Sequence, residues 1–219
     1  MTKKKVLLLA TSCKSGGLCP GGIDWYEPDK WIRIVADDDK AGSVQGKDIA
    51  HAKPLEVIEF DGTPRPIGIQ KENWVINYNS CKVVARYSSH QTKEVLEWVA
   101  KHYGYNGFWG NDRPYLTQNE FDAVCEPTES VLMVSAVKIY RNSYKSTKID
   151  FTWDNGTRSV RGASVTDNDF YDRTLNGSTV ELEHACIVVS IPKYADDWVH
   201  PETGEPRAYK FVSKVFDVS

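Results

Sequence analysis

The chain has 219 residues, of which 41% are hydrophobic and 26% charged, so it is long enough to bury a core and is typical of a globular protein in water. Its formal net charge of -3 excludes binding of polyanions over the whole surface, and any nucleic-acid site must come from a local concentration of basic residues. No stretch approaches the roughly 20 apolar residues of a spanning helix, and we expect no membrane partner.

Three lysines precede a short apolar run at the start of the chain. Lys3, Lys4 and Lys5 followed by residues 6–10 resemble a signal peptide, but the run is shorter than the roughly 7–15 apolar residues that a signal needs. We therefore predict that residues 6–10 form a buried first strand. The chain has 5 cysteines, an odd number, and this count without an export signal favours reduced thiols and a cytoplasmic location.

Short strands and one helix are expected in the rest of the first half. Residues 31–35 (WIRIV) and 55–60 (LEVIEF) have the composition of a second and a third strand. Apolar residues recur at helical spacing over 92–103, which predicts a helix that Gly104 can end. The stretch 105–115 is rich in glycine, asparagine and aromatic residues, which indicates a linker or lid.

The second half is more clearly β-structured. The turn Asp154-Asn155-Gly156 predicts a hairpin between two of its strands. The expected strands are 131–140, 147–153, 157–165, 180–191 and 209–218. Short strands with turn signals in both halves are typical of small barrels or sandwiches, so the predicted fold class is mainly β with one or two helices. We place the first unit at 1–110, including the helix, and the second at 111–219.

Residues 12–22 (SCKSGGLCPGG) combine two cysteines, a lysine and two glycine pairs. Three interpretations stand beside that of a plain glycine-rich connection: an anion site built from backbone N–H groups, a nucleophile at Cys13 next to Lys14, or a metal site. The stretch lacks the end of a P-loop, and neither the cysteines nor the histidines have metal-ligand spacing, so we predict no metal. The candidate ligand-binding residues here are Ser12, Cys13, Lys14, Gly16 and Gly17.

Five segments together resemble the dual OB-containing domain family of bacterial proteins, in the family's order and spacing. They are CKSGGLCPGGID, WIRIV, QKENW (70–74), VTD (165–167) and YKFVSKVF (209–216), and the resemblance covers nearly the whole chain. It implies two tandem OB-like small β-barrels, no assigned enzymatic activity, binding of nucleic acid or a nucleotide, and an association with bacterial defence. Where the family has a serine-arginine-lysine type of sequence this chain has SCKSGG, and it thus lacks one basic residue.

An OB barrel binds oligonucleotides through a basic groove and stacking aromatic side chains. Residues 138–161 combine six basic residues with aromatic ones and with two acids, Asp150 and Asp154. This local segregation of charge predicts a nucleic-acid surface, and the alternative is a solvated hairpin with core aromatics. Phe151 and Trp153 share one strand face, so one of them is a candidate for the core. The candidate nucleic-acid-binding residues are Lys138, Arg141, Tyr144, Lys145, Arg158 and Arg161.

Three further residues are candidate ligand contacts. Arg33 lies in a strand, where it can line a groove or pair with Asp24 or Asp37. Asn73 can bind a base edge and Trp74 can stack on a base, whereas the alternative is a turn asparagine and a core tryptophan. The acidic stretch 165–172 (VTDNDFYD) lacks the pattern of a calcium loop, and we expect a capped loop after a strand.

Together these features predict a non-catalytic module that binds single-stranded nucleic acid or a nucleotide in a bacterial cytoplasm, without a cofactor. Two alternatives stay open. One is an enzyme or small-molecule sensor that uses the 12–22 stretch. The other is a protein-interaction subunit of a larger assembly, which would have a protein partner.

Overall fold

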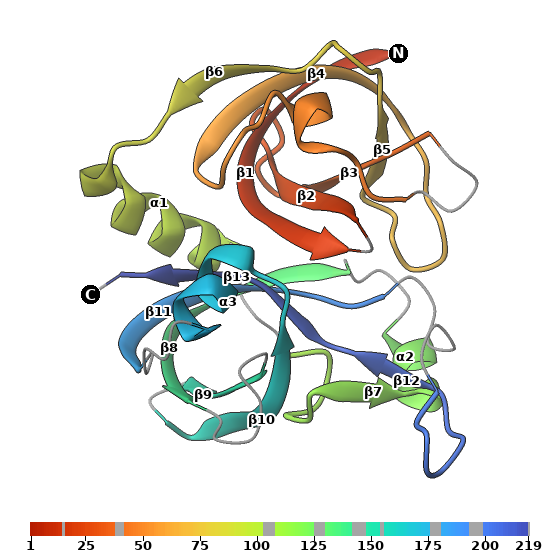
Figure 1. Ribbon diagram of the computed structural model, residues 1–219, viewed down its shortest axis with the longest axis vertical. Helices are drawn as coiled ribbons and strands as arrows, with labels where there is room; N and C mark the ends of the chain where they lie inside the picture. Colours follow the sequence, from red (N-terminus) through yellow and green to blue (C-terminus); the bar gives the residue numbers. More distant parts are fainter. Residues whose placement is uncertain are drawn as a thin grey trace. The chain divides into compact units, whose positions relative to one another are not determined.

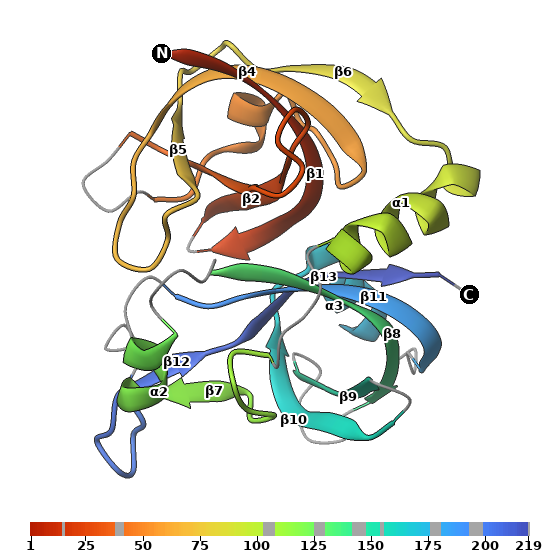
Figure 2. The same cartoon turned by 180° about the vertical axis from the view of Figure 1, so that it is seen from behind.

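The computed structural model describes nine segments of the chain: residues 1–14, 16–37, 42–102, 108–124, 130–141, 148–153, 156–175, 181–192 and 199–218. The chain separates into two compact units, Met1–Val95 and Leu96–Ser219 (Figures 1 and 2). This division falls within helix α1 (Ser89–His102). The boundary between 110 and 111 that the sequence suggested stays a prediction about the folding domains.

The first unit is a five-stranded barrel with one additional strand. Its strands follow the order β1-β2-β3-β5-β4, and β4 pairs with β1 to close the sheet, while β6 extends it on β4. Strands β3 and β5 are parallel and the other pairs are antiparallel. The elements are β1 (Thr2–Lys14), β2 (Gly17–Asp24), β3 (Trp31–Val35), the short helix η1 (Gly46–Ile49), β4 (Glu56–Pro64), β5 (Asn73–Ile76) and β6 (Lys82–Arg86).

Alternation of side chains explains the core of this barrel. On β3, Ile32 and Ile34 lie in the barrel core with Leu8 of β1, and Phe60 of β4 lies there as well. Successive strand residues point to opposite faces, so these positions alternate with residues on the outer face. β-Branched and aromatic residues at such positions favour strands, which is why the sequence identified β3 and most of β4.

The second unit is a closed barrel of the strands β10-β13-β11-β8-β9. Strands β10 and β13 are parallel, and α3 stands between β10 and β11 in the chain. The pair β12-β7 forms a separate two-stranded ribbon. The elements are β7 (Tyr115–Thr117), α2 (Gln118–Ala123), β8 (Val131–Arg141), β9 (Lys148–Trp153), β10 (Arg158–Val165), α3 (Asn168–Leu175), β11 (Leu182–Ser190), β12 (Arg207–Tyr209) and β13 (Phe211–Asp217).

The two barrels share one topology. When the barrel strands of each unit are numbered in chain order, both run first, second, third, fifth, fourth and back to first, with a parallel pair between the third and fifth. A helix precedes the fourth strand in each, η1 in the first and α3 in the second. A closed five-stranded Greek-key barrel is the OB fold, so the predicted mainly β class with two tandem OB-like barrels is confirmed.

The stretch 12–22 is an antiparallel hairpin instead of the loop that its glycines suggested. Strand β1 continues to Lys14, and β2 starts at Gly17. The glycines allow close approach of neighbouring backbone: a Cβ on Gly22 would lie 2.0 Å from the carbonyl oxygen of Leu7, and one on Gly17 would lie 2.9 Å from that of Val44. Only a residue without a side chain fits such gaps, so part of the glycine content serves strand packing.

The described part of the stretch 105–115, residues 108–115, contains buried aromatic side chains and is not a plain linker. The Phe108 side chain is fully buried and that of Trp109 nearly so. The Phe108 ring lies 5.9 Å from the Phe151 ring and 5.3 Å from the Trp153 ring, centroid to centroid. Burial of such large rings contributes strongly to stability, so residues from 108 onward belong to the second unit.

A buried ion cluster holds α3 against β13 in the second unit. Asp167 precedes α3, and its Oδ1 accepts from the N–H of Asp169 at 3.2 Å, as a helix cap does. The same oxygen accepts from Lys214 Nζ at 3.0 Å, and Oδ2 accepts from the N–H of Val215 at 3.0 Å. The prediction of a capped loop over 165–172 is therefore wrong in its larger part, because helix α3 begins at Asn168 and Asp167 caps that helix.

Candidate nucleic-acid interface

The outer face of β8, β9 and β10 is exposed and polar. Along β9, Ile149, Phe151 and Trp153 are buried inside the barrel, so both candidate core aromatics are core residues. The alternate residues of the three strands are partly or fully exposed: Lys138, Tyr140, Lys148, Asp150, Thr152, Ser159 and Arg161. We call this set the sheet face of the second barrel.

The register joins these residues into one surface. Lys138 and Ser159 both lie opposite Thr152, and Tyr140 lies opposite Asp150. Residues directly opposite each other in antiparallel strands have side chains on the same face. The three strands therefore present their outward side chains side by side.

Cations dominate this sheet face. Lys138, Lys148 and Arg161 are its basic residues, and its acid, Asp150, accepts a hydrogen bond from the N–H of Gly162 at 2.7 Å. Lys138 Nζ lies 2.8 Å from Glu183 Oε1, a hydrogen bond that raises the Lys138 pKa, and 5.3 Å from the centre of the Tyr140 ring. The structure thus places a cation beside an exposed aromatic ring, a combination that suits a base and its phosphate.

The side chains of three predicted nucleic-acid-binding residues lie outside the described part of the structure. Tyr144 and Lys145 lie outside the described residues. The backbone of Arg141 pairs with Ile149 at the end of β8, but the position of its side chain is outside the description as well. Their assignment stays a prediction.

Arg158 lies at the barrel end and not on the sheet face. Its guanidinium forms an ion pair with Asp112, with Nε 3.2 Å from Oδ2, and lies 5.3 Å from the centre of the Trp153 ring. Arg158 and Trp153 are opposite each other across β9 and β10. The intramolecular partner means that Arg158 connects the segment around Asp112 to the barrel.

The ribbon of β7 and β12 carries a second group of basic and aromatic side chains. Tyr115 lies opposite Tyr209, with ring centroids 5.9 Å apart. Two guanidinium carbons lie over the Tyr115 ring, that of Arg113 at 5.2 Å and that of Arg207 at 4.3 Å from its centroid. In OB barrels the connection between the fourth and fifth strands contributes to ligand binding, and β12 belongs to that connection here.

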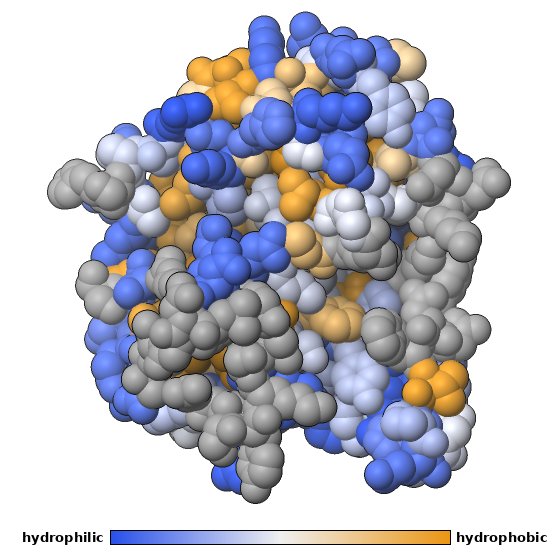
Figure 3. Space-filling model, viewed as in Figure 1, coloured by the Kyte–Doolittle hydropathy of each residue, from blue (hydrophilic) through white to orange (hydrophobic). Residues whose placement is uncertain are grey.

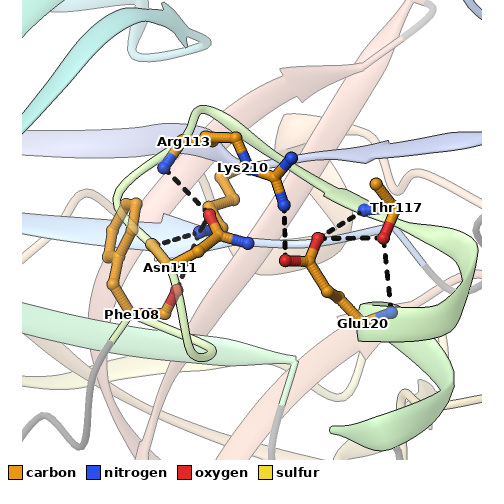
Figure 4. A network of polar contacts seen from close by, with 6 residues as sticks. All are labelled: Phe108, Asn111, Arg113, Thr117, Glu120 and Lys210. Carbon is orange, nitrogen blue, oxygen red and sulfur yellow. Dashed lines mark hydrogen bonds and ion pairs between the residues drawn. The ribbon is translucent and has the colours of Figure 1, made fainter.

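A buried lysine holds this region in place (Figure 4). Lys210 is fully buried, and its Nζ donates to the carbonyl oxygens of Phe108 and Asn111, both at 2.8 Å, and to Asn111 Oδ1 at 3.0 Å. Three acceptors match the three N–H donors of an ammonium group. Glu120 meanwhile pairs with Arg113 and accepts from Thr117, which caps α2.

Burial lowers the pKa of Lys210 from 10.5 to about 7, against the carboxylates of Glu120 and Asp112, which raise it. The unfolded chain therefore binds more protons between these two pH values, and the free energy of unfolding should rise with pH by roughly 1 kcal/mol per unit in that window. Urea unfolding of the wild type and of Lys210→Met between about pH 7 and about pH 9 isolates this contribution as a difference. Equal pH dependence of the two proteins would contradict it.

In the first unit, the structure brings Arg33 and Asn73 together. They are opposite each other in the parallel pair β3–β5. The predicted pairing of Arg33 with Asp24 or Asp37 is wrong for this structure, since Arg33 Nε lies 3.3 Å from Glu72 Oε1. Asp24 pairs instead with Lys4 and Asp37 with Arg65.

Asn73 and Trp74 lie among packed residues of the first barrel. The Asn73 side chain is fully buried, with Nδ2 3.4 Å from Gln70 Oε1. Trp74 packs against the core of the first barrel, with Lys4 Nζ 4.5 Å from its ring centroid. The position of Trp74 agrees with its alternative interpretation as a core residue, whereas Asn73 is the first residue of β5 and not a turn residue. Binding of a ligand by either residue stays a prediction.

The hairpin of β1 and β2 separates its two cysteines. Ser12 lies opposite Cys19, and Cys13 lies opposite Leu18. Because side chains alternate along a strand, Cys13 and Cys19 point to opposite faces and cannot share one metal ion. Gly16 has φ +85°, which suits the tight turn next to Gly17. The Lys14 side chain is outside the description, so the predicted ligand role of this stretch is untested.

The first barrel differs from the second on the corresponding face. Leu7, Ile23 and Trp31 are opposite one another across β1, β2 and β3, and each is at most 3% exposed. They are absent from the barrel's own core cluster, as expected for the outer side of the strands. The exposed basic and aromatic face is therefore a property of the second barrel.

Among the described residues, no three His, Cys, Asp or Glu side chains gather as metal ligands. In the same part of the chain, no helix is long and apolar enough to cross a membrane. On the face drawn in Figure 3, the described surface is mostly hydrophilic, and its apolar residues lie in separate groups.

Sequence reasoning missed Asp112, Arg113, Tyr115, Arg207 and Lys210. A weak signal existed, because Arg113 and Tyr115 have the same spacing as Arg207 and Tyr209, and two residues is the period of a strand. The pairing of two such short strands across the unit is a long-range contact that local patterns do not contain.

The match to a protein-family model agrees with the topology. The model of the family "Dual OB-containing domain" matches residues 4–215. None of the curated proteins matches the chain. Among solved structures, "Crystal structure of the tetrameric p202 HIN2" is similar with 12% sequence identity and a TM-score of 0.32, covering 98% of this chain and 92% of that one. A similarity at this level has no bearing on function.

Proposed function

Because this chain belongs to the dual OB-containing domain family, we propose that its second barrel binds single-stranded nucleic acid on the outer face of β8, β9 and β10. Oligonucleotides bind OB barrels across the second and third strands and the adjoining loops. In this barrel the second and third strands are β9 and β10. The sheet face therefore occupies the position where such barrels bind a strand.

The observation that carries the proposal is the charge of this exposed face. Lys138, Lys148 and Arg161 lie on it, and its acid Asp150 is held by a backbone N–H group. The phosphate backbone supplies most of the affinity in such complexes, through contacts with Lys and Arg. A chain with net charge -3 has no general attraction for polyanions, so this local excess of cations supports a specific location.

The exposed Tyr140 favours a single strand over a duplex. Its side chain is among the exposed large rings of the chain, and it lies within the row of cations. Unpaired bases stack on aromatic rings, whereas bases inside a duplex are already stacked on each other. A strand with its phosphates along the cations and a base on Tyr140 matches these side chains.

Neutralising the three cations should weaken binding and its salt dependence. Each phosphate contact of a single strand contributes about 0.7 to the slope of log K against log salt, so Lys138→Gln, Lys148→Gln and Arg161→Gln combined should lower the slope by about 2. Affinity at low salt should fall by roughly 10–100-fold. Fluorescence anisotropy of labelled single-stranded DNA and RNA over a range of salt concentrations measures both quantities.

A matched variant controls for net charge. Lys30, Lys82 and Arg86 are exposed basic residues of the first unit, each in an ion pair with a glutamate. Their combined change to Gln removes the same charge elsewhere and should leave the slope unchanged. Equal losses in both triple variants would show that the attraction is diffuse, and no binding by the wild type would remove the proposal.

We further propose a cytoplasmic location on the basis of the cysteine content, and a role in bacterial defence on the basis of the family resemblance. A small-molecule or catalytic role of residues 12–22 remains the alternative, and saturable thermal stabilisation by one nucleotide would support it.

A further inference from the structure

We propose that the β7–β12 ribbon is a second phosphate-contact site, where a strand bound to the sheet face continues. This inference rests on the proposed function. The residues concerned are Arg113 and Tyr115 on one side and Arg207 and Tyr209 on the other. We call them the arginine–tyrosine ribbon.

The Tyr115 ring orients both guanidinium groups of this ribbon. The two guanidinium carbons lie 5.2 Å and 4.3 Å from its centroid, so the ring fixes where each cation stands. An arginine stacked on an aromatic ring keeps its N–H groups in the plane available for a phosphate. Pre-orientation reduces the side-chain entropy that binding would otherwise cost.

Arg113 offers the more exposed donors of the ribbon, because the Arg207 side chain is 16% exposed and its Nε is buried. The Arg207 guanidinium lies 3.9 Å from the carboxylate of Glu205. Arg113 pairs with Glu120, but its side chain is 45% exposed. A phosphate offers several acceptor oxygens and can bind the exposed N–H groups of Arg113.

The ribbon is fixed to the barrel at the end of the sheet face. Phe108 packs on Trp153, Asp112 pairs with Arg158, and Lys210 holds the carbonyl groups of Phe108 and Asn111. Thr152 and Ser159 are a cross-strand pair of the sheet face, and the next pair along β9 and β10 is Trp153 with Arg158. A strand that passes over this row toward the barrel end therefore meets the segment that leads to Arg113.

Oligonucleotide length separates the two sites. A strand of about 5 nucleotides matches one face of a barrel, whereas one of about 12 nucleotides can reach a neighbouring site, within the range known for OB folds. Arg113→Gln should weaken binding of the longer strand several-fold and lower its salt slope by about 0.7, with no effect on the shorter strand. Arg86→Gln is the matched control, since Arg86 is also an exposed arginine paired with a glutamate.

The results have distinct meanings. Loss of affinity for the longer strand alone, in Arg113→Gln and not in Arg86→Gln, supports the ribbon site. If the wild type binds both strands and Arg113→Gln binds them equally well, the ribbon site is wrong while the sheet face stands. If the wild type binds neither strand, the proposed function and this inference fail together. Unchanged hydrogen exchange in residues 115–124 verifies that the variant keeps its local structure.

Discussion

Asp167→Ala is expected to destabilise the second unit by roughly 3 kcal/mol, because the nearly buried ammonium of Lys214 loses its buried partner and keeps the exposed carboxylate of Asp169. The Asp167 side chain is 4% exposed, and it binds the ammonium of Lys214 and the N–H groups of Asp169 and Val215. Removal of the carboxylate leaves the ammonium of Lys214 with the solvent-exposed Asp169 as its acidic partner, and it also removes the cap of α3. Both effects act in the same direction.

Hydrogen exchange followed by mass spectrometry measures this effect unit by unit. Amides of β11 and β13 should lose protection in Asp167→Ala, while those of the first barrel keep theirs. Asp169→Ala is the matched control, because Asp169 binds the same lysine at 2.7 Å but has a side chain that is 70% exposed. Its cost should stay below about 1 kcal/mol, as for other surface pairs. Equal costs for the two variants would contradict the account of the buried cluster.

Gly22→Ala is expected to destabilise the first unit by roughly 3 kcal/mol, the upper range for overpacking. A Cβ at this position would lie 2.0 Å from the Leu7 carbonyl oxygen and 2.8 Å from the carbonyl carbon, and backbone cannot move aside as a flexible side chain does. Strands β1 and β2 would have to separate where they pair.

Gly21→Ala gives the comparison for this variant. Its added Cβ would meet the Ile32 carbonyl oxygen at 3.8 Å, an ordinary contact, so the change should cost less than about 1 kcal/mol. The same exchange experiment reports protection in the first barrel. A small loss of stability in Gly22→Ala, equal to that of Gly21→Ala, would mean that packing of the strands does not require glycine at position 22.

Strand patterns explain why most of the fold could be predicted. Residues 31–35 and 131–140 alternate or concentrate β-branched residues, and they correspond to β3 and the first ten residues of β8. The second strand of the first barrel was missed because glycine and proline dominate GLCPGGID, and local propensity opposes a strand there. Closure of the barrel overrides this propensity, since Gly22 fits where a side chain cannot.

The candidate site was partly accessible to the same reasoning. The excess of basic residues over 138–161 identified the hairpin, and alternation places Lys138 and Arg161 outward. Alternation did not show that Arg158 would meet Asp112, because that pair joins residues 46 apart in the chain. The pairing of Tyr115 with Tyr209 could not be predicted from the sequence either, because these residues are also far apart in the chain. Contacts that close a fold depend on topology, which a local pattern does not encode.

Amide NMR shifts of the full chain, titrated with a short single-stranded oligonucleotide at low salt, test the central claim most directly. We predict amide shifts at Lys138, Tyr140, residues 148–152 and residues 159–162, the strand segments that carry the sheet face of the second barrel. The shifts should diminish as salt is added, because phosphate contacts release counterions. Shifts confined to the first unit, or no shifts at all, would contradict the account.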